Sequence, residues 1–270
     1  ERINAIHFPS FRQIRGIIVS KLRINMTESD VSDSGMSGNS DVMQGGAFDI
    51  GWQPTRRLPV YVLLDSSASM AGAPIEAVNE GLIQLYNQLL DTPSAVETVW
   101  ISVIVFGTDA RVQWPLVPIT ESRAVSLSAE GTTSLGAALK LLELSLDYDI
   151  KVGSMTEKGD WRPLVFLLTD GEPTDQWEPV VERLKNRTER RIGTFIALGC
   201  GEEVNGENLK RITDHVLLME NVTSDHLRSF FKWVSQSVSG ASVSAEAAGT
   251  IASRLPSLPE GISRFDATVT

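Results

Sequence analysis

Residues 60–70 read VYVLLDSSASM, and the expected architecture follows from this segment. Its first five residues form an apolar run without a polar face, which favours a central parallel strand that helices cover on both sides. The run ends at Asp65, and Ser67 and Ser69 follow at alternate positions. Open α/β sheets bind ligands in the loops after their strands. We therefore expect this loop to direct one carboxylate and two hydroxyls at a hard, oxygen-seeking cation.

The composition favours one globular domain with tails. The chain has 270 residues, of which 42% are hydrophobic and 21% charged, so it can bury a sizeable core. The formal net charge is −10, and no cluster of lysines and arginines offsets it. This charge argues against a nucleic-acid partner and favours bound cations or basic partners.

The cysteine count and the apolar runs indicate the compartment. A single cysteine, Cys200, excludes an internal disulfide and suits a reducing environment. No apolar run approaches the roughly 20 residues that a membrane span requires. The apolar patch at residues 17–19 is too short, and too interrupted by basic residues, for a signal sequence. We therefore expect a cytoplasmic protein with no membrane partner.

Both ends of the chain are expected to be extensions. Residues 1–57 form an N-terminal extension, in which the first methionine is Met26, so residues 1–25 are equally well explained as native sequence or as a foreign leader. Residues 27–46 are rich in Ser, Asp and Gly, which predicts disorder. Residues 240–270 are rich in Ala, Ser and Gly, and we expect a C-terminal tail that is able to fold back on the domain.

Residues 58–239 alternate between strand and helix patterns. Buried strands are predicted at residues 60–64, 99–106, 163–169, 192–198 and 215–219. Residues 110–114 follow a tight turn and precede Pro115, which predicts an antiparallel strand at the sheet edge. Helices are predicted at residues 75–90, 121–127, 177–190, 208–213 and 225–238, and a glycine turn that begins at residue 130 opens a further helix that continues through Leu146.

This alternation predicts the fold class. Strands that alternate with helices require right-handed crossovers between parallel neighbours. We expect an α/β fold with a doubly wound, mostly parallel six-stranded sheet, one antiparallel edge strand and helices on both faces.

Two further segments repeat the oxygen-rich design of the first. Residues 163–171, PLVFLLTDG, form an apolar strand that ends in Asp170 and a glycine. Residues 130–136, EGTTSLG, form a glycine turn with Thr132 and Thr133 before a helix. The second acid and one of these threonines could complete the site that the first loop begins.

The three segments resemble the metal-ion-dependent adhesion site (MIDAS) of von Willebrand factor type A (VWA) domains, over roughly residues 58–238. The resemblance implies a Rossmann-like VWA fold. It also implies one divalent ion, which the aspartates of the motif bind directly or through water. Thr133 is preferred over the alternative Thr132 because it has the family's spacing to Leu139. The implied metal site consists of Asp65, Ser67, Ser69, Thr133 and Asp170.

The expected ion is Mg²⁺, with Mn²⁺ or Ca²⁺ as alternatives, because the set offers only oxygen ligands and few charges. The resemblance implies that a protein partner completes the coordination with an Asp or Glu carboxylate. The competing interpretation is structural: Asp65 is a strand-end or N-cap acid, and the serines are ordinary turn residues. Three segments in the right order favour the metal site.

Longer runs, at residues 64–82 and 168–175, are similar to the bacterial TerY-like branch, which is associated with tellurium resistance. This similarity implies a scaffold or adaptor in a stress response, accompanied by a protein kinase and a PP2C-type phosphatase. The chain lacks the cysteine-rich, zinc-binding extension of some members, so a role that needs this extension is not expected.

We expect a binding module, not an enzyme. A haloacid dehalogenase type of phosphatase would need an acid where Ser67 stands, and no phosphate-binding loop or nucleophile elbow is present. One alternative is a substrate of the kinase and phosphatase, phosphorylated in residues 27–40 or on Ser67, Ser69 or Thr133. Another is that the acidic N-terminal tail supplies a carboxylate to the metal of its own or a neighbouring molecule.

Overall fold

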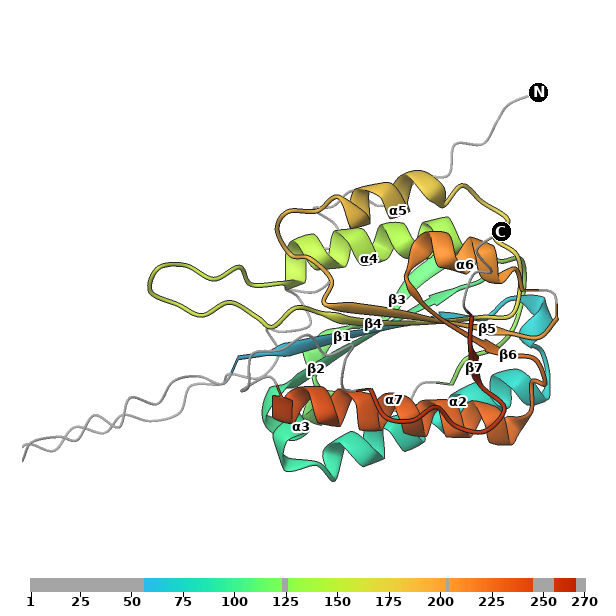
Figure 1. The fold of residues 1–270 in the computed structure, drawn as a ribbon, viewed down its shortest axis with the longest axis horizontal. Coiled ribbons are helices and arrows are strands. Elements are labelled where there is room, and N and C mark those ends of the chain that lie inside the picture. The colour runs from blue at the N-terminus through green and yellow to red at the C-terminus, as the bar shows by residue number, and fades with distance from the viewer. Residues whose placement is uncertain (1–55, 123–125, 203, 245–254, 266–270) are drawn as a thin grey trace, which may run out of the picture. The chain divides into compact units, whose positions relative to one another are not determined.

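The computed structural model describes residues 56–122, 126–202, 204–244 and 255–265. In this part of the chain, a seven-stranded sheet lies between two layers of helices (Figure 1). The predictions for residues 1–55, including the disorder expected at residues 27–46, lie outside the described residues.

The sheet has the strand order β3-β2-β1-β4-β5-β6-β7. Neighbours from β2 to β6 in this order are parallel, whereas β3 is antiparallel to β2 and β7 is antiparallel to β6. The strands are β1 (Leu58–Asp65), β2 (Val99–Phe106), β3 (Ala110–Pro118), β4 (Leu164–Thr169), β5 (Thr194–Cys200), β6 (His215–Met219) and β7 (Ser263–Arg264).

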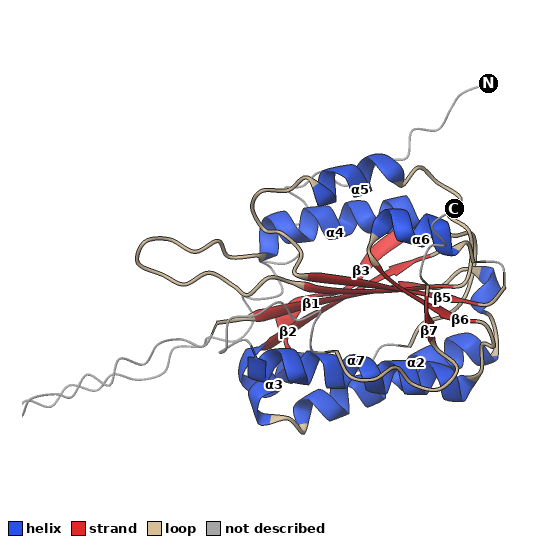
Figure 2. Ribbon diagram, viewed as in Figure 1, coloured by secondary structure: helices blue, strands red, loops and turns tan. Residues whose placement is uncertain are grey.

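Helices cover both faces of the sheet (Figure 2). One layer contains α2, α3 and α7, and the other contains α4, α5 and α6. The helices are α2 (Ala73–Leu90), α3 (Pro93–Thr98), α4 (Leu135–Asp149), α5 (Glu178–Lys185), α6 (Gly206–Ile212) and α7 (Ser224–Ser244), with 3₁₀ turns η1 (Ala68–Met70) and η2 (Ile119–Glu121). No helix in these ranges is long and apolar enough to cross a lipid bilayer.

The predicted fold class is confirmed, and the structure adds a seventh strand. β7 belongs to the predicted C-terminal tail, and it pairs with β6 through Leu217 and Leu218. The tail therefore folds back onto the sheet. Two residues of strand are too short to leave a period-2 pattern in the sequence.

Several predicted boundaries differ from the structure. α5 ends at Lys185 and not at residue 190, and α7 runs to Ser244, into the predicted C-terminal tail. Proline explains two further differences. Pro93 opens the extra helix α3, since proline is well suited to the first turn of a helix. β3 continues through the exposed Pro115 to Pro118, which is tolerated because it is an edge strand with irregular register. The helix predicted at residues 121–127 is not found in the described residues of that range: the turn η2 ends at Glu121, and residues 122, 126 and 127 belong to no helix or strand.

β1 is central because its side chains fill both cores. All eight of its residues are buried. Val60, Val62 and Leu64 pack in the core beneath α2 and α7, while Tyr61 and Leu63 pack in the core beneath α4, α5 and α6. This arrangement places Asp65 at the carboxyl end of the middle of the sheet.

The contact between α2 and α7 depends on a glycine. Gly81 of α2 lies against the fully buried ring of Phe231 of α7, and a Cβ on Gly81 would come within 2.1 Å of that ring. Interiors are packed so densely that an added methyl group of this kind forces its neighbours to shift.

We predict that Gly81→Ala destabilises the domain. Overpacking costs roughly 1–3 kcal/mol, which exceeds the gain of about 1 kcal/mol in helix propensity. The free energy of unfolding, measured by urea denaturation, should therefore fall. Gly240→Ala is the matched control, because Gly240 lies on the exposed face of α7 with no atom within 4 Å of a built Cβ. The control should be neutral or stabilising, and an equal loss in both variants would contradict the packing argument.

Candidate metal site

The first loop of the site is fixed to its neighbours by backbone hydrogen bonds. Ser66 N donates to Phe106 O at the end of β2 (2.7 Å), and Ala68 N donates to Gly131 O (3.0 Å). Glu130 N donates back to Ser66 O (2.8 Å). The loop after β1 is therefore held between the end of β2 and the turn that precedes α4.

Hydroxyl and carboxylate oxygens meet at the carboxyl ends of β1 and β4. Ser67 Oγ lies 3.0 Å from Ser69 Oγ. Asp170 Oδ1 accepts hydrogen bonds from Ser69 Oγ at 2.8 Å and from Ser67 Oγ at 3.4 Å. Ser67 is buried, whereas Ser69 is exposed, so the cluster opens to solvent on one side. The structure thus brings together three of the predicted site residues from two loops.

Asp65 lies behind this cluster and is fully buried. Its Oδ1 accepts from Ser67 N (2.8 Å), and its Oδ2 accepts from Thr169 Oγ1 (2.6 Å). Burial raises the pKa of the Asp65 carboxyl above its usual range; the hydrogen bonds from Thr169 and Ser67 oppose this shift, and the charge of Asp170 adds to it. A cation beside the two carboxylates would offset both the burial and the repulsion.

Thr169 is a site residue that the sequence reasoning missed. β1 and β4 are parallel neighbours in the register Leu64 to Leu168, so the residues after these two leucines lie side by side. A threonine beside a buried acid at this position is the signal that could have identified it.

Thr133 lies beside the loop that carries Asp170. It is buried, and a Cβ on Gly171 would come within 3.1 Å of its Oγ1. The alternative, Thr132, is exposed, and its backbone N donates to Thr108 Oγ1 at 3.4 Å. The structure therefore favours Thr133 as the threonine that faces the site.

Asp175 holds the second and third loops together. Its carboxylate accepts from Gly136 N and Ala137 N, both at 2.8 Å, in the first turn of α4. Thr174 N also donates to Thr133 O (2.9 Å). The first-turn amides of a helix lack partners within the helix, and a carboxylate there also benefits from the helix dipole. Asp175 therefore anchors the loop that carries Thr133.

Glu172, like Asp175, anchors the loop after β4, but to the start of α6. Its carboxylate accepts from Asn205 N and Asn208 Nδ2, both at 2.8 Å. These bonds connect the loop after β4 with the start of α6. Like Asp175, Glu172 positions a loop.

The donor set fits a hard divalent ion. It offers three hydroxyls and two carboxylates, all of them oxygen ligands of the kind that Mg²⁺ and similar ions prefer. The described residues contain no group of three or more His, Cys, Asp or Glu side chains suited to a metal. Cys200, at the end of β5, is buried, and burial raises the pKa of its thiol, so it stays protonated.

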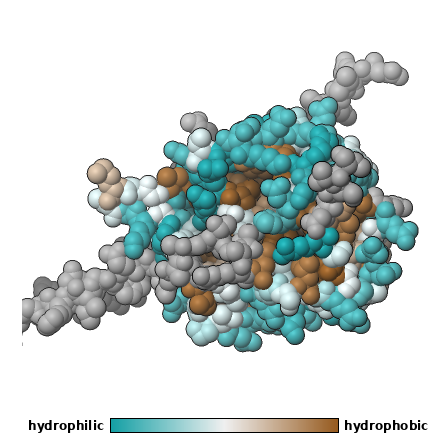
Figure 3. Space-filling model, viewed as in Figure 1, coloured by the Kyte–Doolittle hydropathy of each residue, from teal (hydrophilic) through white to brown (hydrophobic). Residues whose placement is uncertain are grey.

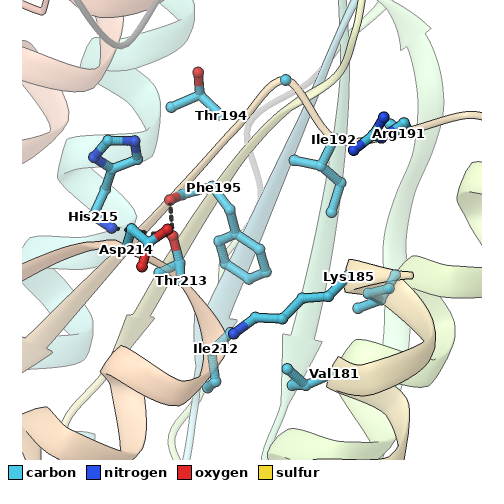
Figure 4. A pocket seen from close by; sticks show the side chains of 12 residues that line it. Val181, Lys185, Arg191, Ile192, Thr194, Phe195, Ile212, Thr213, Asp214 and His215 are labelled. Carbon is cyan, nitrogen blue, oxygen red and sulfur yellow. Dashed lines mark hydrogen bonds between the residues drawn. The ribbon is translucent and has the colours of Figure 1, made fainter. Parts of the chain in front are cut away.

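A cavity of about 260 Å³ lies at the other end of the strands from the oxygen cluster, at the amino ends of β5 and β6 (Figure 4). Lys185 extends along it and donates to Arg211 O at 2.5 Å. Thr213 Oγ1 donates to Phe195 O at the other side. The first contact joins the ends of α5 and α6, and the second joins the residue after α6 to the start of β5. Neither involves the oxygen cluster.

The fold and the oxygen cluster together define a class of protein, a doubly wound α/β domain whose ligand site lies at the carboxyl edge of the sheet. The family model of the von Willebrand factor type A domain matches residues 60–232, more than half of the chain. The chain therefore belongs to the VWA family, as its motifs predicted. Domains of this family are typically metal-dependent protein-interaction modules.

Solved structures share the fold at low sequence identity. A von Willebrand factor type A protein from Catenulispora acidiphila has a TM-score of 0.54 at 19% identity, with 68% of this chain and 43% of that chain covered. The pilus adhesin SpaC from Lactobacillus rhamnosus GG has 0.55 at 13% identity, with 69% and 31% covered. A mutant of the PilB minor pilin from Streptococcus sanguinis has 0.50 at 12% identity, with 77% and 65% covered.

These likenesses support the fold alone, and the chain spans less than two thirds of each of the three structures. The comparison with curated proteins finds no match.

We predict that Asp175→Ala lowers the free energy of unfolding by about 2 kcal/mol, because two charge-assisted hydrogen bonds at a helix N-terminus are lost. Thermal denaturation would measure the change. Asp214→Ala is the matched control, since it removes the same charge from an exposed position before β6. A loss in the control as large as that in Asp175→Ala would show that charge, not anchoring, sets the stability.

Proposed function

We propose that this chain is a metal-ion-dependent protein-binding module in which Asp65, Ser67, Ser69, Thr133 and Asp170 hold one divalent ion. The proposal is carried by one observation: Ser67 Oγ, Ser69 Oγ and Asp170 Oδ1 lie within 3.4 Å of one another in front of the buried Asp65. Mg²⁺ is the preferred ion, with Mn²⁺ or Ca²⁺ as alternatives, since each is a hard cation that takes oxygen ligands.

The proposed ligands have different roles. The two serines and Thr133 supply neutral oxygens, and Asp170 supplies negative charge at the surface. Asp65 supplies negative charge from its buried position behind the serines, because both of its oxygens already accept hydrogen bonds. When bound, the ion supplies a Lewis-acidic centre with room for one more oxygen ligand, and an Asp or Glu carboxylate of a protein partner is the expected donor.

The cellular setting belongs to the same proposal. The runs that are similar to the TerY-like branch support a cytoplasmic scaffold or adaptor in a tellurium-resistance or stress-response system, with a protein kinase and a PP2C-type phosphatase as partners. The site supports binding and not catalysis, because its side chains provide ligands for an ion and no paired nucleophile and base.

We predict that isothermal titration calorimetry detects Mg²⁺ or Mn²⁺ binding to the full chain and that Asp65→Ala and Asp170→Ala abolish it. Thr133→Ala should weaken binding by tenfold or more, about 1.4 kcal/mol, because it removes one neutral ligand. Thr132→Ala is the matched control, and it should bind as the wild type does. Unchanged binding in Asp170→Ala would rule out the site, and loss in Thr132→Ala alone would transfer the ligand role to Thr132.

Phosphorylation is a second candidate function, and burial limits which of the site hydroxyls a kinase could reach. Ser67 and Thr133 are buried, whereas Ser69 is exposed and hydrogen-bonded to Asp170. Among the site hydroxyls, a kinase could therefore reach Ser69 most easily. A phosphate there would repel the adjacent carboxylate and displace a ligand hydroxyl. The other expected sites, in residues 27–40, lie outside the described residues.

We predict that mass spectrometry, after incubation with a kinase encoded beside this protein, places phosphate on Ser69 or within residues 27–40. Ser69→Ala separates the two positions. An unmodified chain would remove this candidate.

The N-terminal tail is the other alternative, as the donor of a carboxylate to the metal. Truncation of residues 1–50 should then raise the affinity for a partner, and unchanged affinity would exclude this role of the tail.

A further inference from the structure

The connection between α4 and β4 projects from the domain as a finger, defined here as residues 151–160 (Figure 1). Its two arms are joined by hydrogen bonds from Asp160 N to Lys151 O and from Ser154 N to Glu157 O, both 2.9 Å long. Gly153 and Gly159 lie where the arms meet, and a Cβ on Gly159 would come within 2.3 Å of the Gly153 nitrogen. The arms approach too closely there for any larger residue.

The base of the finger is fixed to the start of β1. Arg57 forms an ion pair with Asp160, whose side chain is only 3% exposed. Arg56 donates to Gly159 O at 2.7 Å, and its guanidinium lies 3.8 Å from the centre of the Trp161 ring. Charge-assisted bonds and cation–π contacts of this kind fix the direction of the finger relative to the sheet.

The outer part of the finger packs on nothing in the described domain. Residues 151–158 are all exposed, and Met155 is 106% exposed. Figure 3 shows hydrophobic atoms at the outer end of this projection. The exposed part carries one carboxylate, Glu157, between the positive charges of Lys151 and Lys158. A projection that is anchored at its base and carries an adaptable thioether and exposed charges has the chemistry of a contact surface, not of a core element.

The edge of the sheet that carries the proposed metal site has the opposite character. Its described loops, at residues 66–72, 107–109, 130–134, 170–177, 201–205 (apart from 203) and 220–223, contain no lysine or arginine. They contain seven acids: Asp109, Glu130, Asp170, Glu172, Asp175, Glu202 and Glu220. Such an edge favours a partner that brings positive charge around a single carboxylate.

We propose that the finger of one copy of this chain docks on the metal site of another copy, with Glu157 as the carboxylate that completes the coordination of the ion. The proposal rests on the function proposed above. Lys151 and Lys158 would face the acidic loops, and Met155 would lie against the exposed surface beside them. The finger supplies both features that the site requires, one acid and a positive surround.

The geometry makes this contact intermolecular. The finger lies at the amino ends of the strands, and the site lies at their carboxyl ends (Figure 1). β1 has eight residues and spans roughly 26 Å, so a fixed finger cannot reach the site of its own chain. A contact between two different surfaces is heterologous, and it generates rings or open chains of subunits.

The first test is sedimentation velocity on the chain of residues 1–270. With Mg²⁺ the wild type should form oligomers that grow with protein concentration, and EDTA should return it to the monomer. Glu157→Gln removes the charge of an exposed side chain and should weaken association at least tenfold. Glu97→Gln is the matched control, because Glu97 is an exposed acid on α3 outside the finger, and it should associate as the wild type does.

The second test mixes two defective chains. Glu157→Gln keeps an intact site, and Asp170→Ala keeps an intact finger. Each alone should therefore associate at least tenfold more weakly than the wild type, and their mixture should form a one-to-one dimer. A wild type that binds Mg²⁺ by calorimetry and remains monomeric would overturn the finger proposal and leave the proposed function standing. A wild type that binds no divalent ion would overturn both.

Discussion

One hydrogen bond, from Thr169 Oγ1 to Asp65 Oδ2, joins the two central strands at the point where the candidate site begins. Asp65 is fully buried, and a buried carboxylate is costly unless hydrogen bonds or a cation compensate for lost hydration. Thr169 and the Ser67 amide supply part of this compensation from within the protein. The arrangement of the surrounding loops follows from the need to supply the remainder at a single, solvent-facing point.

Hydrogen bonds link each loop around that point to the next, so the loops are held as one unit. The loop after β1 bonds to the turn before α4, that turn bonds to the loop after β4 through Thr174 and Asp175, and Glu172 continues the connection to the start of α6. The side chains that would contact a ligand are therefore preorganised by others that do not. Preorganisation of this kind reduces the cost of ordering flexible groups when a ligand binds.

The sequence predicted the strands well because five buried parallel strands produce long apolar runs. It also predicted that Asp65, Ser67, Ser69 and Asp170 come together, since the carboxyl ends of adjacent parallel strands share one edge. Thr169 and Asp175 were not identified, because their roles depend on strand register and on a helix end that is distant in the chain. β7 was missed because two residues carry no periodicity, and α3 because Pro93 can end one helix or begin another.

β7 also has a consequence for solubility. The outer strand of a sheet exposes unpaired amides and carbonyls that can recruit the same strand of another molecule, which is a route to aggregation. The chain returns after α7 to pair Ser263 and Arg264 with β6, and Phe265 N donates to Val216 O at 3.0 Å. At the other side of the sheet, the prolines of β3 remove donors from the edge. Both borders of the sheet are therefore poor templates for uncontrolled strand addition.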